Sequence, residues 1–502
     1  MSQRPLTNRP SAPGASRPPS LERWIRRFAT RHWFCIGIFA TVLFALQIRS
    51  WWSPTPDVTG YFSIARSVWA GGGLSNLGNR VLHYAPGYPL LISPAFLFGD
   101  QAFLIIALLR FVIVLVTAAA IFFWMRRLIP RPAALLLTLI VIFNVSFWRY
   151  YRVALSDLPM MMFLMLGALA ARKTLTAPST RSSLLWALCT AVLLLAGTLT
   201  RQTALTLATG FAIAAFFARR ERRERFKFVL LTAAILLPAL IAAAYVAHHD
   251  QSAIRTQKAV TYIDQLQSLK EHFFTQVSTD LHLRISDIGR LLIPGMWNAH
   301  GRAGNWLDFN LIIYLPLAVL VALGWFRLAR RTNDPLLWSA PFYVLFYILW
   351  PFDQDTRFFT PILPILAISL WPLLRCMAQW RFTLLAFLCA AHLGVSITLG
   401  IVETRRDGRE FRQSWPALKE IALTEAGGKA PPAGQQFAER GLSPNASLWL
   451  QYLIDRPIVH VPVTGAEIPG DVQWLAQPAS APVPPGFSAV QSAGPFRVLR
   501  KK

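Results

Sequence analysis

Charged residues are scarce in this chain, and acidic residues are the scarcest. Of its 502 residues, 15% are Asp, Glu, Lys or Arg, whereas 54% are hydrophobic. A soluble domain needs a water-facing surface and rarely shows this balance. The composition therefore excludes an ordinary soluble protein and predicts a protein that lies in a membrane.

The charge that is present is mostly of one sign, because 50 Lys and Arg outnumber 24 Asp and Glu and give a net charge of +26. Such an excess can indicate a nucleic-acid partner. Here, however, the basic residues lie between apolar runs and not along one amphipathic face. We therefore expect no nucleic acid and interpret these residues as signals of membrane topology.

Cysteine, internal repeats and a cleavage signal are also missing or sparse. The four cysteines all lie inside apolar runs, so the sequence contains no disulfide framework and no CxxC metal site. The lack of a repeat argues against the duplicated architecture of many transporters. No Ala-x-Ala-like site follows the first apolar run, so we expect that run to be retained as a span.

Apolar runs long enough to cross a bilayer are abundant. A hydrocarbon core about 30 Å thick needs about twenty apolar residues in a helix. We predict an all-α polytopic membrane protein with about eleven transmembrane helices. They lie near residues 33–49, 102–124, 133–148, 154–171, 184–200, 203–218, 229–247, 309–326, 336–350, 358–374 and 382–402.

The connections between these spans predict their orientation, because Lys and Arg are retained on the cytoplasmic side. Every second connection is rich in basic residues, as is the segment before the first span. We therefore expect a multi-pass protein of the cytoplasmic (inner) membrane, with its N-terminus in the cytoplasm and its C-terminus in the periplasm or outside the cell.

This orientation divides the chain into three parts. We expect a disordered basic cytoplasmic tail at 1–32, a transmembrane domain at 33–402 and an extracytoplasmic C-terminal domain at 403–502. The transmembrane domain carries two long outer loops, at 50–101 and 248–308, and loops of this length usually carry function.

Local patterns predict structure within the outer pieces. Residues 61–69 have the spacing of an amphipathic helix that lies in the interface with its aromatic side chains at headgroup level. Residues 90–98 are apolar but too short to span, which favours a second interfacial or re-entrant element. Short alternating stretches at 457–461 and 496–499 predict a small α/β domain in the tail.

Asp57 is the sharpest candidate for chemistry, because it directly follows the first span and precedes the expected interfacial helix. A carboxylate at this position can cap the helix, which contributes about 0.5–2 kcal/mol. It can also serve as a general base for an acceptor hydroxyl or amine. The residues around it leave both roles open.

Arg80, His83 and Tyr84 follow in the same loop and bring a cation, an imidazole and a phenol to the outer surface. A guanidinium can bind two phosphate oxygens, and a site at the membrane boundary is accessible to a lipid headgroup. Simple anchoring at the headgroups is the alternative for each of them.

A second acid, Asp157, follows the third span and the arginines Arg149 and Arg152. Its alternatives are a helix start and a contact with substrate or metal. Arg201 lies in a short turn between the fifth and sixth spans, so it is expected at the same outer surface. Arg110 lies inside the second span, where an ionisable side chain is costly and indicates function unless it snorkels.

Arg357 lies between the ninth and tenth spans, at the outer surface. An ion pair with the neighbouring Asp353 or Asp355 is the structural alternative to a contact with phosphate.

In the order, side and spacing of these residues, the chain resembles the membrane glycosyltransferases of the C-type fold. Within this fold it resembles specifically the bacterial protein-mannosyltransferase-like and aminoarabinose-transferase-like branch. The resemblance covers most of residues 33–402. It rests on Asp57 with Tyr61 and Ala65, the run Tyr84-Ala85-Pro86-Gly87-Tyr88-Pro89-Leu90, Ser156-Asp157, and Arg357-Phe358 before Pro361 and Pro364.

The resemblance implies that Asp57 is catalytic, that the donor is a polyprenyl-phosphate-linked sugar, and that the anomeric carbon is inverted. The chain departs from the pattern twice. Val58 stands where many relatives have a second acid, and Phe358 stands where they have Tyr. Because the first departure weakens the case for a divalent metal, we expect no metal ligands and no cofactor.

We therefore predict an inverting glycosyltransferase that moves a sugar from polyprenyl phosphate to a lipid, glycan or protein acceptor on the outer face. The predicted catalytic residues are Asp57 and Asp157. The predicted donor-binding and phosphate-binding residues are Arg80, His83, Tyr84, Arg149, Arg152, Arg201 and Arg357.

The alternative function is a lipid or solute transporter or flippase, which would need ionisable groups near the bilayer midplane. A third is a non-catalytic assembly protein that uses its tail for interactions.

Overall fold

The computed structural model describes most of the chain, and the account below concerns these parts. They are residues 20–77, 84–217, 237, 241, 273–294, 309–348, 355–377, 379–425, 436–454, 458–461, 468 and 472–501.

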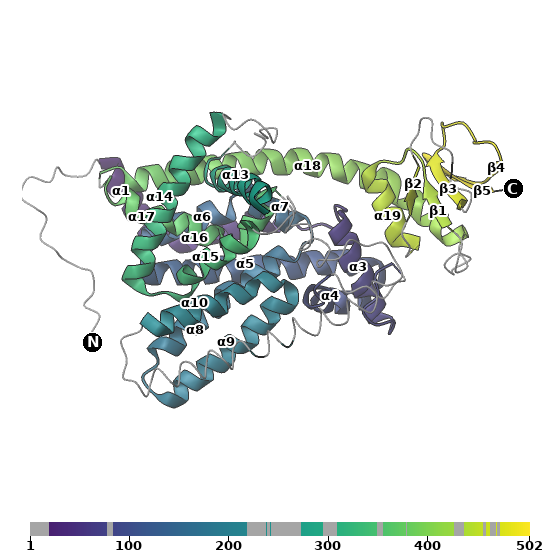
Figure 1. The fold of residues 1–502 in the computed structure, drawn as a ribbon. Coiled ribbons are helices and arrows are strands. Elements are labelled where there is room, and N and C mark those ends of the chain that lie inside the picture. The colour runs from purple at the N-terminus through teal and green to yellow at the C-terminus, as the bar shows by residue number, and fades with distance from the viewer. Residues whose placement is uncertain are drawn as a thin grey trace, which may run out of the picture.

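Helices dominate the described chain, and a small sheet lies at one end of the molecule, away from the N-terminal helices (Figure 1). Six helical stretches are long and apolar enough to cross a membrane. They are Gly87–Leu128, Asp157–Thr176, Thr180–Thr200, Ile312–Thr332, Thr356–Leu374 and Arg381–Ala422. The chain is thus a multi-pass membrane protein, as predicted.

Two further spans are broken helix pairs, which would bring the count of described spans to eight. Helix α1 (Ser20–Arg31) and helix α2 (Trp33–Ala45) meet at 75°. Helices α6 (Arg131–Ile142) and α7 (Val145–Arg152) meet at 54°. Helices α10 (Thr206–Phe217) and α15 (Pro335–Ile348) are apolar but shorter. The predicted span at 229–247 lies outside the described residues, so the total of eleven stays a prediction.

The predicted span at 133–148 contains a sharp bend. Helix α6 ends at Ile142, and the side chain of Asn144 accepts a hydrogen bond of 3.0 Å from the backbone N–H of Ser146. An Asn side chain in this position satisfies a free amide at a helix start, so it begins a new helix in a new direction. Helix α7 is that helix, and it carries Arg149 and Arg152.

The first outer loop consists of α3 (Pro56–Trp69), α4 (Gly87–Ile92) and the 3₁₀ segment η1 (Ser93–Gln101). Both predicted interfacial elements are therefore helical. The expectation that the aromatic side chains lie at headgroup level stays a prediction, but Tyr61 and Phe62 are 6% and 1% exposed and therefore contact protein. Their rings pack inside the protein, because α4 and η1 cover helix α3.

The main helical bundle is completed by α5, α8, α9, α14 and the segments after residue 355. Helix α13 belongs to the second predicted outer loop and packs against α14 and η5. The bounds are α5 (Ala102–Leu128), α8 (Asp157–Thr176), α9 (Thr180–Thr200), η2 (Gln202–Leu205), α13 (Phe273–Leu292), α14 (Phe309–Thr332), η5 (Asp355–Ile362), α16 (Leu363–Ser369) and α17 (Trp371–Leu374).

The chain leaves the bundle through α18 (Arg381–Glu425), a helix of 45 residues that reaches the sheet (Figure 1). The predicted domain boundary at 403 falls inside this helix. The sheet has the strand order β2-β1-β3-β5-β4, in which β1 is parallel to β2 and β3 and the other pairs are antiparallel. The elements are β1 (Gln436–Glu439), α19 (Pro444–Ile454), β2 (Val459–His460), β3 (Val472–Pro478), β4 (Phe487–Ala493) and β5 (Phe496–Lys501).

The small α/β domain predicted for the tail is thus confirmed: the stretch at 457–461 contains β2, and the stretch at 496–499 lies within β5.

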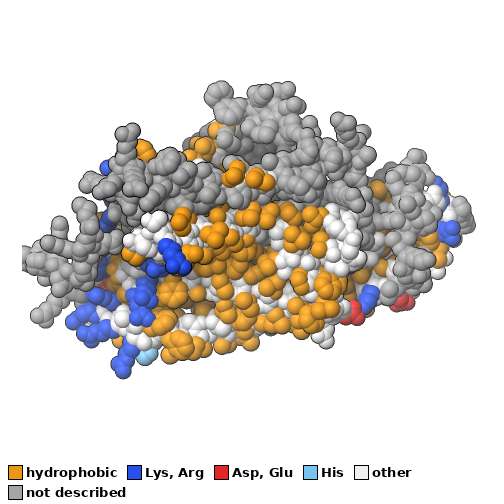
Figure 2. Space-filling model, turned by 90° about the horizontal axis from the view of Figure 1, so that it is seen from below, with side chains coloured by type: hydrophobic (Ala, Val, Ile, Leu, Met, Phe, Trp, Pro, Cys, Tyr) orange, Lys and Arg blue, Asp and Glu red, His pale blue; other side chains and the backbone are white. Residues whose placement is uncertain are grey.

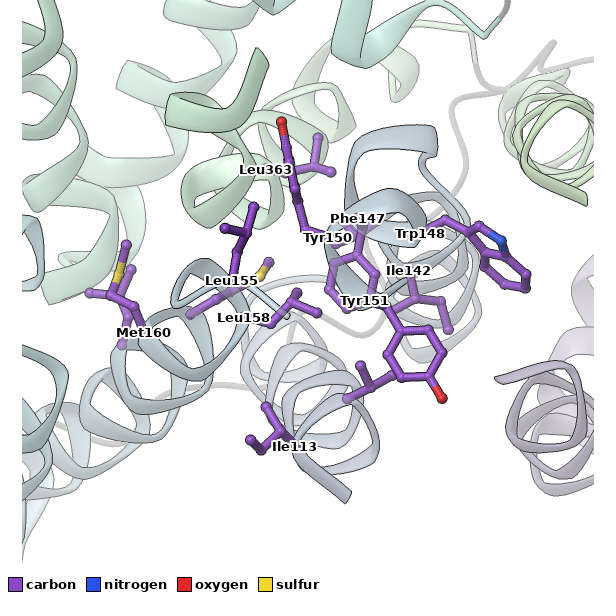
Figure 3. Close-up of a cluster of buried hydrophobic side chains, with 14 of the residues drawn as sticks. Ile113, Ile142, Phe147, Trp148, Tyr150, Tyr151, Leu155, Leu158, Met160 and Leu363 are labelled. Carbon is purple, nitrogen blue, oxygen red and sulfur yellow. The ribbon is translucent and has the colours of Figure 1, made fainter. Parts of the chain in front are cut away.

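The surface of the bundle matches a lipid environment. One face shows hydrophobic side chains over most of its length, with Lys and Arg gathered at the end opposite the sheet (Figure 2). Inside, helix α7 lies in an apolar core, in which Phe147 and Tyr151 pack among Ile113, Ile142 and Leu158 of the neighbouring helices (Figure 3). This core fixes α7 and the turn that leads into Asp157.

Candidate active site

Asp57 lies in the first turn of α3 but does not cap it. The cap is Thr55, whose hydroxyl accepts a hydrogen bond of 3.2 Å from the backbone N–H of Val58. Pro56 occupies the first helical position, where a missing N–H costs nothing. The carboxylate of Asp57 is therefore released from the capping role, and its side chain remains 30% exposed.

Asp157 begins helix α8 and is fully buried, with a side-chain exposure of 0%. Its first carboxylate oxygen forms an ion pair with Nη1 of Arg201, and its second accepts a hydrogen bond of 3.0 Å from Nε of Arg357. A buried carboxylate is stable only when it is paired in this way. The Asp157 side chain thus holds two guanidinium groups side by side.

Arg357 connects the two acids. While its Nε binds Asp157, its Nη1 binds the second oxygen of Asp57. The sequence left open an ion pair of Arg357 with Asp353 or Asp355. Asp353 lies outside the described part of the chain, and the side chain of Asp355 is not described. Arg357 thus brings the first-loop acid and the α8 acid, exactly 100 positions apart in sequence, into one cluster.

Aromatic rings form cation–π contacts with the guanidinium groups. The Cζ atom of Arg201 lies 5.6 Å from the ring centre of Phe358, and that of Arg284 lies 5.2 Å from it. Phe358 in turn stacks on Tyr347 at 4.1 Å. Phenylalanine at this position therefore serves as a platform for cations, a contact that needs a ring face and no hydroxyl.

Arg284 also lies beside these arginine and aromatic side chains, and the sequence did not indicate it. It lies on α13 and is buried, and it donates from Nη1 to Asp287 at 3.0 Å and from Nε to the carbonyl of Tyr347 at 3.3 Å. Nothing distinguishes it in sequence from the other basic residues of the loop at 248–308. Only the packing of α13 against η5 brings it to the cluster.

Tyr61 lies one helical turn after Asp57 and links α3 to the start of α8. Its hydroxyl and that of Ser156 lie 2.9 Å apart. Burial, followed by the nearby Asp57 carboxylate, raises the pKa of Tyr61 to about 12. The phenol therefore keeps its proton at physiological pH and can act as a hydrogen-bond donor.

Tyr84 lies over the same turn of α3. Its ring centre is 5.1 Å from that of Tyr61, and its hydroxyl lies 3.4 Å from the carbonyl of Pro56. Gly60 makes this approach possible, because a Cβ at position 60 would lie 2.5 Å from Cε2 of Tyr84. The predicted Tyr84 thus reaches the acid-bearing turn.

The remaining predicted residues lie elsewhere or are not described. Arg80 and His83 lie outside the described residues. Arg152 pairs with Glu403 and lies 4.0 Å from Asp407, both on α18, while Arg149 lies one turn before it on α7. The structure therefore places Asp57, Asp157, Arg201 and Arg357 in one ion-pair network and places Arg152 in another.

The residues of the network do not fit a divalent metal. Both carboxylates are already bound by guanidinium groups, and Val58 follows Asp57 where a second acid would be needed. In the described part of the chain, no three His, Cys, Asp or Glu side chains are grouped to hold a metal ion. We therefore derive no step through a metal.

Comparison with solved structures identifies the fold. The aminoarabinose transferase ArnT from Cupriavidus metallidurans superimposes with a TM-score of 0.54 at 12% identity, over 94% of this chain and 98% of ArnT. Its complex with undecaprenyl phosphate gives 0.52 at 11% identity, over 93% and 97%. The chain has the C-type glycosyltransferase fold.

The same C-type fold is found in the oligosaccharyltransferase AglB from Archaeoglobus fulgidus, solved with an inhibitory peptide and a dolichol-phosphate. AglB superimposes with a TM-score of 0.54 at 12% identity, over 90% of this chain and 70% of AglB. No protein-family model and no curated protein matches the sequence. The likeness therefore lies in the architecture, which supports the resemblance seen in the sequence motifs.

Proposed function

We propose that the chain is an inverting glycosyltransferase that uses a polyprenyl-phosphate-linked sugar as donor. The acceptor is a hydroxyl or amine of a lipid, glycan or protein at the outer face of the cytoplasmic membrane. The observation that carries the proposal is the network of Asp57, Asp157, Arg201 and Arg357, in which a partly exposed carboxylate lies beside two guanidinium groups. Solved structures with the same fold contain undecaprenyl phosphate or dolichol-phosphate, which supports this donor class.

In the proposed reaction the acceptor oxygen or nitrogen attacks the anomeric carbon of the donor sugar. The bond between that carbon and the phosphate oxygen breaks, and polyprenyl phosphate leaves with the electron pair. Asp57 accepts the acceptor proton, because it is the more exposed of the two acids. Attack opposite the leaving group inverts the anomeric carbon.

Arg357 and Arg201 stabilise the negative charge that develops on the departing phosphate. Arg357 uses Nε and Nη1 for the two acids, so its Nη2 remains for a phosphate oxygen. A bound phosphate competes with Asp57 for this guanidinium. Binding of the donor thus weakens the ion pair of Asp57 and releases it to act as the base.

Asp157 is better suited to positioning than to proton transfer. It is completely buried, and both of its oxygens are bound by arginine. We therefore propose that Asp157 holds Arg201 and Arg357 in place. It then acts as a positioning residue and not as the catalytic residue expected from the sequence.

The location of the network favours an enzyme over a transporter. Asp57 lies in the first turn of α3, Asp157 begins α8, and Arg201 directly follows α9. All three lie at helix ends, whereas transport across the bilayer uses ionisable groups near the midplane.

The test is sugar transfer by purified Asp57→Asn protein, with a polyprenyl-phosphate sugar as donor. Loss of the general base predicts a rate lower by about 100- to 10,000-fold. The matched control is Asp100→Asn, because Asp100 is an exposed acid that forms an ion pair of 2.9 Å with the surface residue Lys419. Transfer at the wild-type rate by Asp57→Asn, in protein of normal thermal stability, would remove Asp57 from the mechanism.

A further inference from the structure

A second group of basic residues lies at the same end of the helices as Asp57. Arg49 follows α2, Arg110 lies two turns into α5, and Arg152 ends α7. Together with Gln47, Trp51 and Tyr151 they line a cavity, which we name the arginine cavity. The cavity is small, with a volume of about 20 Å³, and it is partly open to solvent.

Arg110 is the unusual member of this group. It is buried, with 9% of its surface exposed, and its guanidinium lies over the ring of Tyr151 at 5.5 Å. Within the described residues it forms no hydrogen bond and no ion pair, whereas a buried guanidinium normally has anionic or carbonyl acceptors. Arg110 is therefore a cation that has no protein acceptor among the described residues and that lines a cavity.

The neighbours of Arg110 do not neutralise the cavity. Arg49 donates to two neutral oxygens, one from Gln47 at 2.9 Å and one from Thr404, and its guanidinium lies 4.7 Å from the ring centre of Trp51. Glu403 forms an ion pair with Arg152, and Asp407 lies 4.0 Å from Arg152.

Asp407 also accepts hydrogen bonds from Ser53 at 2.9 Å and from Arg406 at 3.0 Å. Three arginines thus share two carboxylates, one of which a fourth arginine also uses. The positive charge of the cavity is unbalanced, and an anion would balance it.

We propose that the arginine cavity binds the phosphate group of an anionic lipid, at a site separate from the network of Asp57 and Asp157. Phosphate fits because guanidinium groups bind its oxygens in pairs. A lipid is the source that the position favours, because Arg110 lies inside a membrane-spanning stretch, about 12 Å beyond the start of α5 at Ala102 at 1.5 Å per residue. This proposal does not depend on sugar transfer, since it concerns binding alone.

The test uses full-length protein in detergent, titrated with dioctanoyl phosphatidic acid and, separately, with inorganic phosphate. Arg110→Gln should weaken binding of phosphatidic acid by about tenfold or more, because it removes a charge-assisted hydrogen-bond donor. The matched control is Arg412→Gln, which removes one positive charge from an exposed part of α18 and should bind like the wild type. Arg357→Gln should also retain this binding.

A variant with the opposite effect separates loss of the site from misfolding. Glu403→Gln releases Arg152 from its ion pair and should tighten phosphatidic acid binding several-fold. If inorganic phosphate follows the same pattern, the phosphate alone is recognised; if only the lipid binds, its acyl chains contribute. Equal affinities for Arg110→Gln and Arg412→Gln, or weaker binding by Glu403→Gln, would overturn the proposal.

Discussion

At the scale of single residues, the two acids of the network differ in burial, and this difference assigns them different tasks. Asp57 has room for an acceptor, whereas Asp157 has none, because its two oxygens are bound by Arg201 and Arg357. Removing the charge of Asp157 should therefore disturb the position of two guanidinium groups and leave Asp57, the proposed base, in place.

The first prediction follows from this difference. Asp157→Asn should raise the KM for the lipid-phosphate donor more than it lowers kcat, whereas Asp57→Asn should lower kcat mainly. Asp157→Asn should also destabilise the protein by about 3–5 kcal/mol, because it leaves buried guanidinium groups without a partner. Steady-state kinetics and thermal unfolding of both variants measure this. A purely catalytic effect of Asp157→Asn, without change in KM or stability, would contradict the positioning role.

A second prediction concerns Gly60, which gives Tyr84 access to the acid-bearing turn. Gly60→Ala should displace the Tyr84 ring, because the added Cβ would lie 2.5 Å from it, and should lower the rate of sugar transfer. In a Tyr84→Ala background the same substitution should have little further effect. Rates of the four proteins form a double-mutant cycle. Additive losses would mean that Gly60 acts through something other than Tyr84.

The sequence indicated these residues for sound reasons but could not show their partners. Asp57, Asp157 and Arg357 stand out because they lie at the outer ends of the predicted spans, which the basic flanks place at one surface. The pairing of Arg357 with acids 200 and 300 positions away depends on the packing of η5 against α8, which no local pattern encodes. Capping shows the same limit, because Thr55 takes the position that seemed open to Asp57.

At the scale of elements, composition predicted where helices lie but not where they bend. The apolar run at 133–148 has no Gly or Pro to mark a bend, yet Asn144 divides it into α6 and α7. The direction of α7 after this break brings it to η5, which it contacts through a hydrogen bond of 2.8 Å between the hydroxyls of Ser146 and Thr356. Thr356 directly precedes Arg357.

A third prediction concerns the packing of α14 against α16. Gly324 allows the two helices to touch, since a Cβ there would lie 1.9 Å from the carbonyl oxygen of Ser369. Gly324→Ala should therefore destabilise the protein by about 1–3 kcal/mol through overpacking. Gly394→Ala on α18 is the matched control, because nothing lies within 4 Å of its Cβ position. Thermal unfolding in detergent compares the two, and equal stabilities would refute the close contact.

At the scale of the whole molecule, the distribution of basic side chains and the position of the sheet indicate the same orientation in the membrane. Basic side chains gather at the end of the bundle opposite the sheet, and the sheet is carried away from the bundle on α18 (Figures 1 and 2). Basic flanks stay in the cytoplasm, so the network and the C-terminal domain should both lie on the outer side. An outer location is also what a donor flipped across the membrane would require.

Labelling of single cysteines tests this orientation. In a background whose four native cysteines are replaced by serine, Ser480→Cys in the exposed turn between β3 and β4 should react with a membrane-impermeant maleimide in intact cells. Thr176→Cys, exposed at the end of α8, should react only after the cells are permeabilised. The reverse pattern would turn the network toward the cytoplasm, where nucleotide sugars and not polyprenyl-phosphate sugars would be the expected donors. The orientation of the bundle therefore decides which donor the network of Asp57 and Asp157 can meet.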